Sequence, residues 1–260
     1  MEFRNIQIRN VPIAFTAGPP TPNLAPTPPT YPPGAFVGGA GATYNNLVSM
    51  PSVSGPFGGN LSPYYALSPG GYVAIAPNTN WAPGTDDFTI EWFQYGLSSG
   101  SALYPRIFTV GVFPSTSIGV SIESGTFYFW VNGGLFGLFS MSITDNTWRH
   151  IAVCRYSINN LIVYVDGVVK GVAYIGNVNI SNATAQLNLF GEATDVNTTF
   201  NGYITNFRWC NGIRVYSGAS TTSANFVVPT SPLTQIAAAN PYGGSNTAEI
   251  TSGQCKLLVP

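Results

Sequence analysis

The stretch FNGYITNFRWCNGIRVY, residues 200–216, carries the clearest pattern in this chain and holds five aromatic residues, two arginines and one cysteine. Side chains alternate in direction along a β-strand, so Phe207 and Trp209 share one face while Arg208 points to the other. We therefore predict a strand whose aromatic face lies in a core. The residues at its rim stay open as contact candidates: Asn211, Arg214 and Tyr216.

The composition supports an all-β protein of low charge. Charged residues make up 7% of the 260 residues and the formal net charge is -1, against about 25% charged residues in ordinary soluble domains. No basic field exists to attract nucleic acid or anionic lipid, so neither is expected as a partner. No apolar run is long enough for a membrane helix, and the first residues do not resemble a Sec signal peptide.

Short strand-like segments follow one another from residue 71, separated by turn residues. Strong hairpin dipeptides stand at Asn132-Gly133 and Asp166-Gly167, and a further turn is expected at Asn159-Asn160. About a dozen alternating segments predict a two-sheet antiparallel jelly-roll sandwich over residues 71–260.

The N-terminal part has a different character. Residues 10–85 contain no Lys, Arg, Asp, Glu or His, and residues 12–33 hold nine prolines. Proline fixes φ and lacks an N–H, so we expect an extended arm over residues 1–70. A flexible linker is one alternative, and an arm that lies on its own domain is another, but we expect the arm to anchor the chain to a neighbouring subunit. The apolar residues expected to make this contact are Phe3, Ile6, Ile8, Phe15, Leu24, Tyr31 and Phe36.

Three cysteines are present, Cys154, Cys210 and Cys255, all in strand-like stretches. An odd number without close spacing argues against a disulfide framework and against a zinc site. We expect buried free thiols, although spacing alone leaves a Cys154–Cys210 or a Cys210–Cys255 bridge open.

Several segments, in their order, resemble the laminin G-like (concanavalin A-like) jelly-roll family. They are DFTIEWFQY (87–95), WRHIAVCR (148–155), LIVYVDGVVKG (161–171), LNLFGE (187–192), FNGYITNFRW (200–209), FVVPTSPL (226–233) and KLLVP (256–260). The resemblance implies a sandwich of two curved antiparallel sheets. It also implies a range of activities, from none through sugar or protein binding to glycoside hydrolysis.

Glycoside hydrolysis needs two carboxylates flanking the scissile bond. This chain has ten acidic residues, and Glu91 and Glu123 each stand alone in a strand-like stretch. The lone histidine, His150, is expected to be a hydrogen-bonded strand residue rather than a catalytic base. We therefore expect no enzymatic activity and no required cofactor.

Relatives in this family suggest a calcium site at a loop rim. The stretch GEATDVNTTF, residues 191–200, offers Glu192, Asp195 and Asn197 as oxygen ligands, although a plain polar turn is the alternative. Sugar binding would use exposed aromatic faces beside amide groups, and the aromatic candidates can equally be core residues. The glycan candidates are Trp81, Asn211, Arg214 and Tyr216, with Trp130 and Tyr242 as further aromatic residues.

Three function classes remain open on the sequence. We expect first a non-enzymatic structural component of a large multi-subunit assembly, such as a minor capsid, decoration or fibre protein of a virion, assembled in the host cytoplasm. A carbohydrate-binding module is the second hypothesis, and it is compatible with the first. A glycoside hydrolase is the third.

Overall fold

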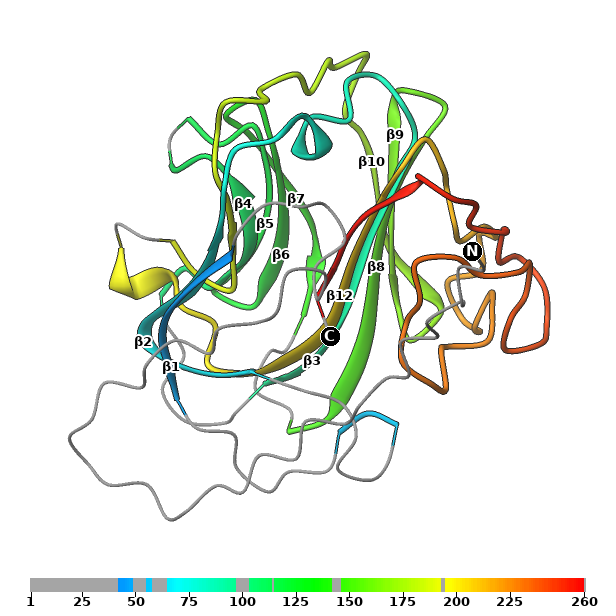
Figure 1. The fold of residues 1–260 in the computed structure, drawn as a ribbon. Helices are drawn as coiled ribbons and strands as arrows, with labels where there is room; N and C mark the ends of the chain where they lie inside the picture. Colours follow the sequence, from blue (N-terminus) through cyan, green and yellow to red (C-terminus); the bar gives the residue numbers. More distant parts are fainter. Residues whose placement is uncertain are drawn as a thin grey trace, which may run out of the picture.

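A computed structural model describes residues 42–48, 55–57, 65–96, 103–113, 115–141, 146–192 and 195–259. The regular secondary structure of the described chain is almost entirely β-strand (Figure 1), as the sequence predicts. Its elements are β1 (Ala42–Val48), β2 (Tyr65–Ile75), η1 (Thr79–Trp81), β3 (Phe88–Gly96), β4 (Arg106–Val110), β5 (Ile118–Glu123), β6 (Thr126–Val131), β7 (Gly134–Ser140), β8 (Trp148–Tyr156), β9 (Asn160–Val165), β10 (Val168–Tyr174), β11 (Leu187–Leu189), η2 (Val196–Thr198), β12 (Gly202–Asn211) and β13 (Cys255–Val259).

The strands form two antiparallel layers that face each other (Figure 1). One layer, here called the strap layer, has the order β10-β9-β8-β3-β12, with β13 also paired to β12. The other, the rim layer, runs β1-β2-β11-β4-β5-β6-β7. A short pairing of β12 with β2 joins the two layers into one continuous ladder of hydrogen bonds. This is the predicted all-β jelly-roll sandwich.

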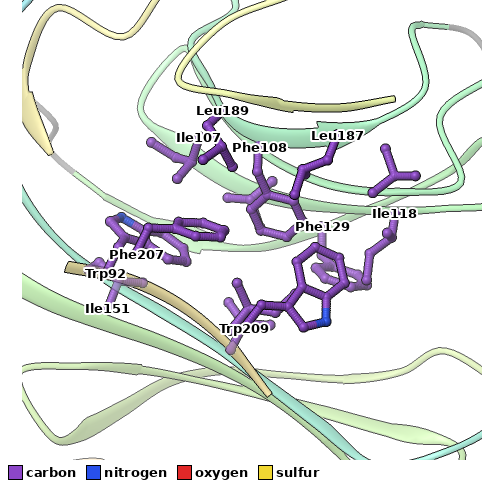
Figure 2. Close-up of a cluster of buried hydrophobic side chains, with 14 of the residues drawn as sticks. Trp92, Ile107, Phe108, Ile118, Phe129, Ile151, Leu187, Leu189, Phe207 and Trp209 are labelled. Carbon is purple, nitrogen blue, oxygen red and sulfur yellow. The ribbon is translucent and has the colours of Figure 1, made fainter. Parts of the chain in front are cut away.

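The main core fills the space between the layers. Trp92, Phe207 and Trp209 from the strap layer meet Phe108 and Phe129 from the rim layer, and all five side chains are fully buried (Figure 2). The Phe108 ring lies 5.8 Å from Phe207 and 5.5 Å from Trp209, in edge-to-face geometry. The aromatic face of β12 is therefore core, as its alternation predicts.

Two of the predicted hairpins form as expected. Asn132 and Gly133 have φ of 45° and 77°, and Asp166 and Gly167 have φ of 49° and 78°. Two successive positive φ values define the tight turn that matches the twist of paired strands.

The turn expected at Asn159-Asn160 lies two residues earlier. Ser157 and Ile158 take the positive φ values, 50° and 63°, and Asn160 already begins β9. Arg155 Nε donates to the Ile158 carbonyl at 2.8 Å and so holds a β-branched residue in a conformation that it rarely adopts. The Arg155 guanidinium also donates to the Gly84 and Val178 carbonyls, so the residue that holds this turn is itself fixed by tertiary contacts.

The strap layer is covered on both faces. Residues 212–254, here called the strap, cross the outer face of β8, β3 and β12 and contain only isolated bridges, without a named strand. Their apolar side chains form a second buried cluster with those strands, which includes Val215, Tyr216, Phe226 and Ile250. This cover explains why every residue of β3 except Tyr95 is buried, including Thr89 and Glu91.

The predicted arm falls mostly outside the described residues. Its contact candidates, Phe3, Ile6, Ile8, Phe15, Leu24, Tyr31 and Phe36, all lie outside them. Residues 42–48 form β1 and pair with β2, which itself begins at Tyr65. Two strands of the sandwich therefore begin before the predicted boundary at residue 70. Within the described ranges, no helix has the length and apolar character needed to cross a bilayer.

Candidate functional site

The predicted calcium loop connects β11 to β12 and folds around the short helix η2. Asp195 caps this helix, because its Oδ1 accepts from the backbone N–H of Asn197 at 2.8 Å and from the Asn197 side-chain amide at 2.9 Å. Glu192 points elsewhere, and its Oε1 lies 3.6 Å from Arg106 Nε. Asp195 and Asn197 thus bind each other, whereas Glu192 faces Arg106.

This donor set fits calcium poorly. Burial raises the pKa of Glu192, and the Arg106 guanidinium only partly opposes that rise. A cation placed on Glu192 would meet the positive charge of Arg106, whereas calcium needs six to eight oxygen ligands with net negative charge. The part of the chain that the structure describes contains no group of three or more His, Cys, Asp or Glu side chains arranged to hold a metal ion.

Two of the predicted glycan residues, Trp81 and Asn211, hold the 3-10 helix η1 against the end of β12. Trp81 is fully buried, its ring lies 5.9 Å from that of Trp209, and its Nε1 donates to the Ala76 carbonyl at 3.1 Å. Asn211 accepts from Trp209 Nε1 at 2.7 Å and donates to the Asn80 carbonyl at 2.9 Å. Trp81 therefore has no free ring face for a sugar in this structure.

The other two predicted glycan residues, Arg214 and Tyr216, belong to the beginning of the strap. Tyr216 is buried, and its hydroxyl donates to Glu91 Oε2 at 2.7 Å. Arg214 lies 4.1 Å from the centre of the Tyr156 ring and donates to the Tyr164 hydroxyl at 2.9 Å. The four glycan candidates consequently do not share one surface, and the structure uses Tyr216 as an internal hydrogen-bond donor.

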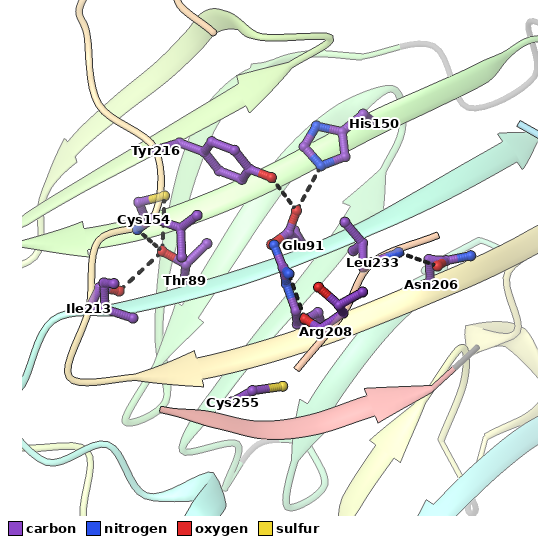
Figure 3. Close-up of polar contacts among 12 residues, drawn as sticks. Thr89, Glu91, His150, Cys154, Asn206, Arg208, Ile213, Tyr216, Leu233 and Cys255 are labelled. Atoms are coloured by element: carbon purple, nitrogen blue, oxygen red, sulfur yellow. Dashed lines mark hydrogen bonds and ion pairs between the residues drawn. The ribbon is translucent and has the colours of Figure 1, made fainter. Parts of the chain in front are cut away.

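Glu91 is the centre of a buried polar network (Figure 3). Its Oε1 accepts from Arg208 Nε at 2.8 Å and from Arg208 Nη2 at 2.6 Å, while its Oε2 accepts from Tyr216 and contacts His150 Nε2 at 3.0 Å. Burial opposes the charged carboxylate, but the charge of Arg208 and the His150 hydrogen bond outweigh it and lower the pKa of Glu91 to about 2. Glu91 is therefore a fully partnered anion.

This network is structural rather than catalytic. Arg208 also donates to the Thr234 carbonyl at 2.8 Å, so the ion pair ties the strap to β12 and β3. The side chains of Glu91 and His150 have no exposed surface and cannot meet a substrate. The expectation that His150 is a hydrogen-bonded strand residue is confirmed. The partners of Glu91 are His150, Arg208 and Tyr216, which the sequence did not reveal.

A second polar cluster lies on the outer face of the rim layer and reaches solvent. Trp130 Nε1 donates to Ser121 Oγ at 2.8 Å, and Ser121 Oγ donates to Glu123 Oε1 at 2.8 Å. Arg106 forms an ion pair with Glu123, and its guanidinium carbon lies 5.0 Å from the centre of the Trp130 ring. The Phe113 ring stands edge-on to Trp130 at 5.5 Å.

Three exposed apolar side chains lie on the segments that form this cluster. Phe113 is 56% exposed, Tyr104, two residues before Arg106, is 46% exposed and Leu135 is 45% exposed, whereas Trp130 is 6% exposed. Leu135 pairs with Trp130 across β6 and β7, and the Tyr104 N–H donates to the Asn197 carbonyl at 3.1 Å. We call Tyr104, Phe113, Trp130 and Leu135 the aromatic rim.

The rim combines aromatic faces with fixed polar groups, which is the chemistry that sugar recognition uses. The sequence shows Tyr104 and Phe113 as bulky apolar residues in stretches without strand alternation. It does not predict that they share a surface with Arg106 or Glu123. Trp130, weighed as a sugar candidate in the sequence, lies in this cluster, whereas Tyr242 lies in the strap and its hydroxyl contacts the Ser231 carbonyl at 3.5 Å.

Comparisons with known proteins agree with the architecture. The sequence pattern described as the concanavalin A-like lectin/glucanases superfamily matches residues 67–220. No curated protein matches the chain.

Among solved structures, the botulinum neurotoxin serotype G binding domain is similar to this chain at 17% identity and a TM-score of 0.48, covering 66% of this chain and 43% of that one. The binding domain of Paraclostridial Mosquitocidal Protein 1 is similar at 14% identity and a TM-score of 0.47, covering 64% and 42%. Domains LG4-5 of the mouse laminin alpha1 chain are similar at 16% identity and a TM-score of 0.42, covering 58% and 41%.

This chain spans less than half the length of each of these three structures. The family pattern, in contrast, covers more than half of this chain and includes β3 through β12. By that match, the chain belongs to the concanavalin A-like lectin/glucanases superfamily.

Proposed function

We propose that this chain is a non-enzymatic glycan-binding module, and that the aromatic rim is its binding surface. The observation that carries the proposal is the exposed Phe113 ring packed against Trp130, beside the Arg106–Glu123 ion pair. A sugar ring stacks its C–H face on an aromatic ring, while its hydroxyls need fixed donors and acceptors at the edge. Phe113 supplies the aromatic ring for stacking, and the partly exposed Glu123 supplies an acceptor for the sugar hydroxyls.

The same geometry argues against hydrolysis at this surface. Glu123 and Glu192 both contact one guanidinium, that of Arg106. Retaining and inverting glycosidases need the space between two carboxylates for the sugar or for water. Here the single positive charge of Arg106 lies between the two acids and contacts both of them. The surface therefore supports binding and lacks a free acid–nucleophile pair.

A glycan array with the purified chain tests this proposal, followed by titration calorimetry on any hit. Phe113→Ala should weaken binding about tenfold or more, which corresponds to about 1.4 kcal/mol for the lost stacking contact. The matched control is Tyr174→Ala, because Tyr174 is 69% exposed and lies on β10, in the other layer. Equal loss in both variants, or an empty array with folded protein, would count against the rim.

A second role is supported by the sequence: a structural component of a large assembly such as a virion, in which residues 1–70 anchor the chain to neighbouring subunits. The observation in its favour is the absence of charge over residues 10–85, together with nine prolines in residues 12–33. An uncharged, extended arm gains contact area on a neighbour at little desolvation cost. This role is compatible with glycan binding by the sandwich.

Deletion of residues 1–40 tests the anchoring role, because it leaves β1 intact. The truncated chain should retain the circular-dichroism spectrum of a β-sandwich but should no longer be incorporated into assembled particles. Normal incorporation of the truncated chain would exclude the arm as the anchor.

A further inference from the structure

Cys210 and Cys255 are direct partners across two antiparallel strands. In the pairing of β12 with β13, Cys210 stands opposite Cys255, after a local shift in register at Trp209. Both thiols are reduced and buried in this structure, and Cys255 lies on β13 beside Arg208 in Figure 3. Opposed residues of antiparallel strands have Cα atoms about 4.5–5.5 Å apart, which lies within the range of about 4.4–6.8 Å that a disulfide requires.

The third cysteine is too far away to compete. Thr89 on β3 pairs with Cys210 on one side and with Cys154 on the other, so Cys154 is two strands from Cys210 and three from Cys255. Strands lie about 4.8 Å apart, so two strands separate the backbones by roughly 10 Å. This exceeds the separation of about 7 Å beyond which two cysteines cannot be bridged without backbone movement.

We propose that Cys210 and Cys255 form a redox pair that closes into a cross-strand disulfide and fastens the strap. The electron acceptor is a small-molecule disulfide of the glutathione class. The strap begins directly after Asn211, the last residue of β12, and ends at Gln254, so a bond between Cys210 and Cys255 would join its two ends covalently.

The reaction proceeds by two exchanges. The Cys255 thiolate attacks one sulfur of the small disulfide, which releases one small thiol and leaves a mixed disulfide on Cys255. The Cys210 thiol then attacks the Cys255 sulfur and passes its proton to the departing small thiolate, which leaves as the second small thiol. Overall, the two protein thiols lose two protons and two electrons, and one small disulfide becomes two small thiols.

The surroundings favour this order of attack. The hydrogen bond from Cys210 lowers the pKa of Cys255, and the same hydrogen bond, together with burial, raises the pKa of Cys210. The turn that precedes Cys255, residues 251–253, is exposed, and a side-chain carbon placed on Gly253 would contact nothing. Cys255 is therefore the thiol closer to solvent and the better nucleophile.

Mass spectrometry on the unmodified chain tests the proposal. The protein is incubated with glutathione disulfide, unfolded in denaturant and treated with an alkylating reagent. We expect the oxidised chain to accept one alkyl group, on Cys154, and the reduced chain to accept three. Peptide mapping should link Cys210 to Cys255. Three alkyl groups after oxidation, or a linkage that includes Cys154, would overturn the proposal.

Thermal unfolding supplies a second readout. Closing the loop of residues 211–254 should raise the Tm of the oxidised chain by about 5–10 °C over the reduced chain, because the cross-link restricts the unfolded state. Cys154→Ser should keep this difference and Cys255→Ser should abolish it. A difference that persists in Cys255→Ser would show that oxidation acts elsewhere.

Discussion

Acid is expected to weaken this fold through one buried carboxylate, Glu91. Its pKa in the folded chain is about 2, below the ordinary value of 4.5, because Arg208 and the His150 hydrogen bond outweigh its burial. The unfolded chain therefore takes up the proton first as pH falls. The stability that Glu91 contributes is fully present above about pH 4.5 and is lost as pH approaches 2.

The size of this effect follows from the two pKa values. A change from 4.5 to about 2 corresponds to about 3 kcal/mol of stability at neutral pH. Glu91 is fully buried, so solvent does not screen the interaction. Removing the charge with Glu91→Gln should cost about 3–5 kcal/mol at pH 7, because Arg208 is then buried without its partner.

Urea unfolding between pH 7 and pH 2, followed by tryptophan fluorescence, measures both quantities. Trp92 and Trp209 are fully buried and should report loss of the core. Wild type and the exposed control Glu249→Gln should lose the same stability on acidification, whereas Glu91→Gln should lose about 3 kcal/mol less. If Glu91→Gln does not fold, the double variant Glu91→Gln/Arg208→Met is compared with wild type instead. This double variant also removes the unpaired cation.

Parallel pH profiles for wild type and Glu91→Gln would refute this reasoning. So would a cost below about 1 kcal/mol for Glu91→Gln at pH 7, since that is the range of exposed ion pairs.

Four further substitutions test the packing. Gly167→Ala and Gly212→Ala both place a side chain at positive φ, 78° and 73°, but only the new carbon at residue 167 would lie 3.0 Å from a strap carbonyl, that of Phe226. In chemical denaturation, Gly167→Ala should therefore lower the free energy of unfolding by about 1 kcal/mol more than Gly212→Ala. Phe207→Ala should cost about 3–5 kcal/mol in the same assay, because the ring is fully buried between the layers. Tyr216→Phe should cost about 1–3 kcal/mol, since Glu91 loses a buried hydrogen bond, and calorimetry would detect the lowered Tm.

Local patterns predicted the sandwich well. The alternation in β12 correctly placed Phe207 and Trp209 in the core and Arg208 on the opposite face. The dipeptides Asn132-Gly133 and Asp166-Gly167 correctly placed two hairpins. These features depend on neighbouring residues alone, so one sequence is enough to read them.

The buried network could not be predicted in the same way. His150, Arg208 and Tyr216 lie 59, 117 and 125 residues from Glu91 in the chain. Only the strand order β8-β3-β12 brings them together, and only the strap places Tyr216 above them. From the sequence alone, Glu91 therefore has no visible partner, and Tyr216 resembles an exposed residue just beyond the end of a strand.

The aromatic rim shows a related limit. Phe113 and Tyr104 lie outside the regular strands, where periodicity carries no information. Their nearness to Arg106 and Glu192 depends on loops from three separate parts of the chain. Conversely, Trp81 was a reasonable sugar candidate by residue type, but its packing against Trp209 removes it from the surface.

The strap has a consequence for how this scaffold tolerates sequence change. Because β3, β8 and β12 are covered on both sides, a saturation-mutagenesis scan should find nearly every position in them intolerant, without a two-residue rhythm. On β10, where buried and exposed positions alternate over Val169–Val172, tolerance should rise and fall with every second residue. Sequence divergence, and with it any change in what the protein recognises, is thereby directed to the edge strands β7 and β10, the exposed residues of the aromatic rim and the exposed turns of the strap.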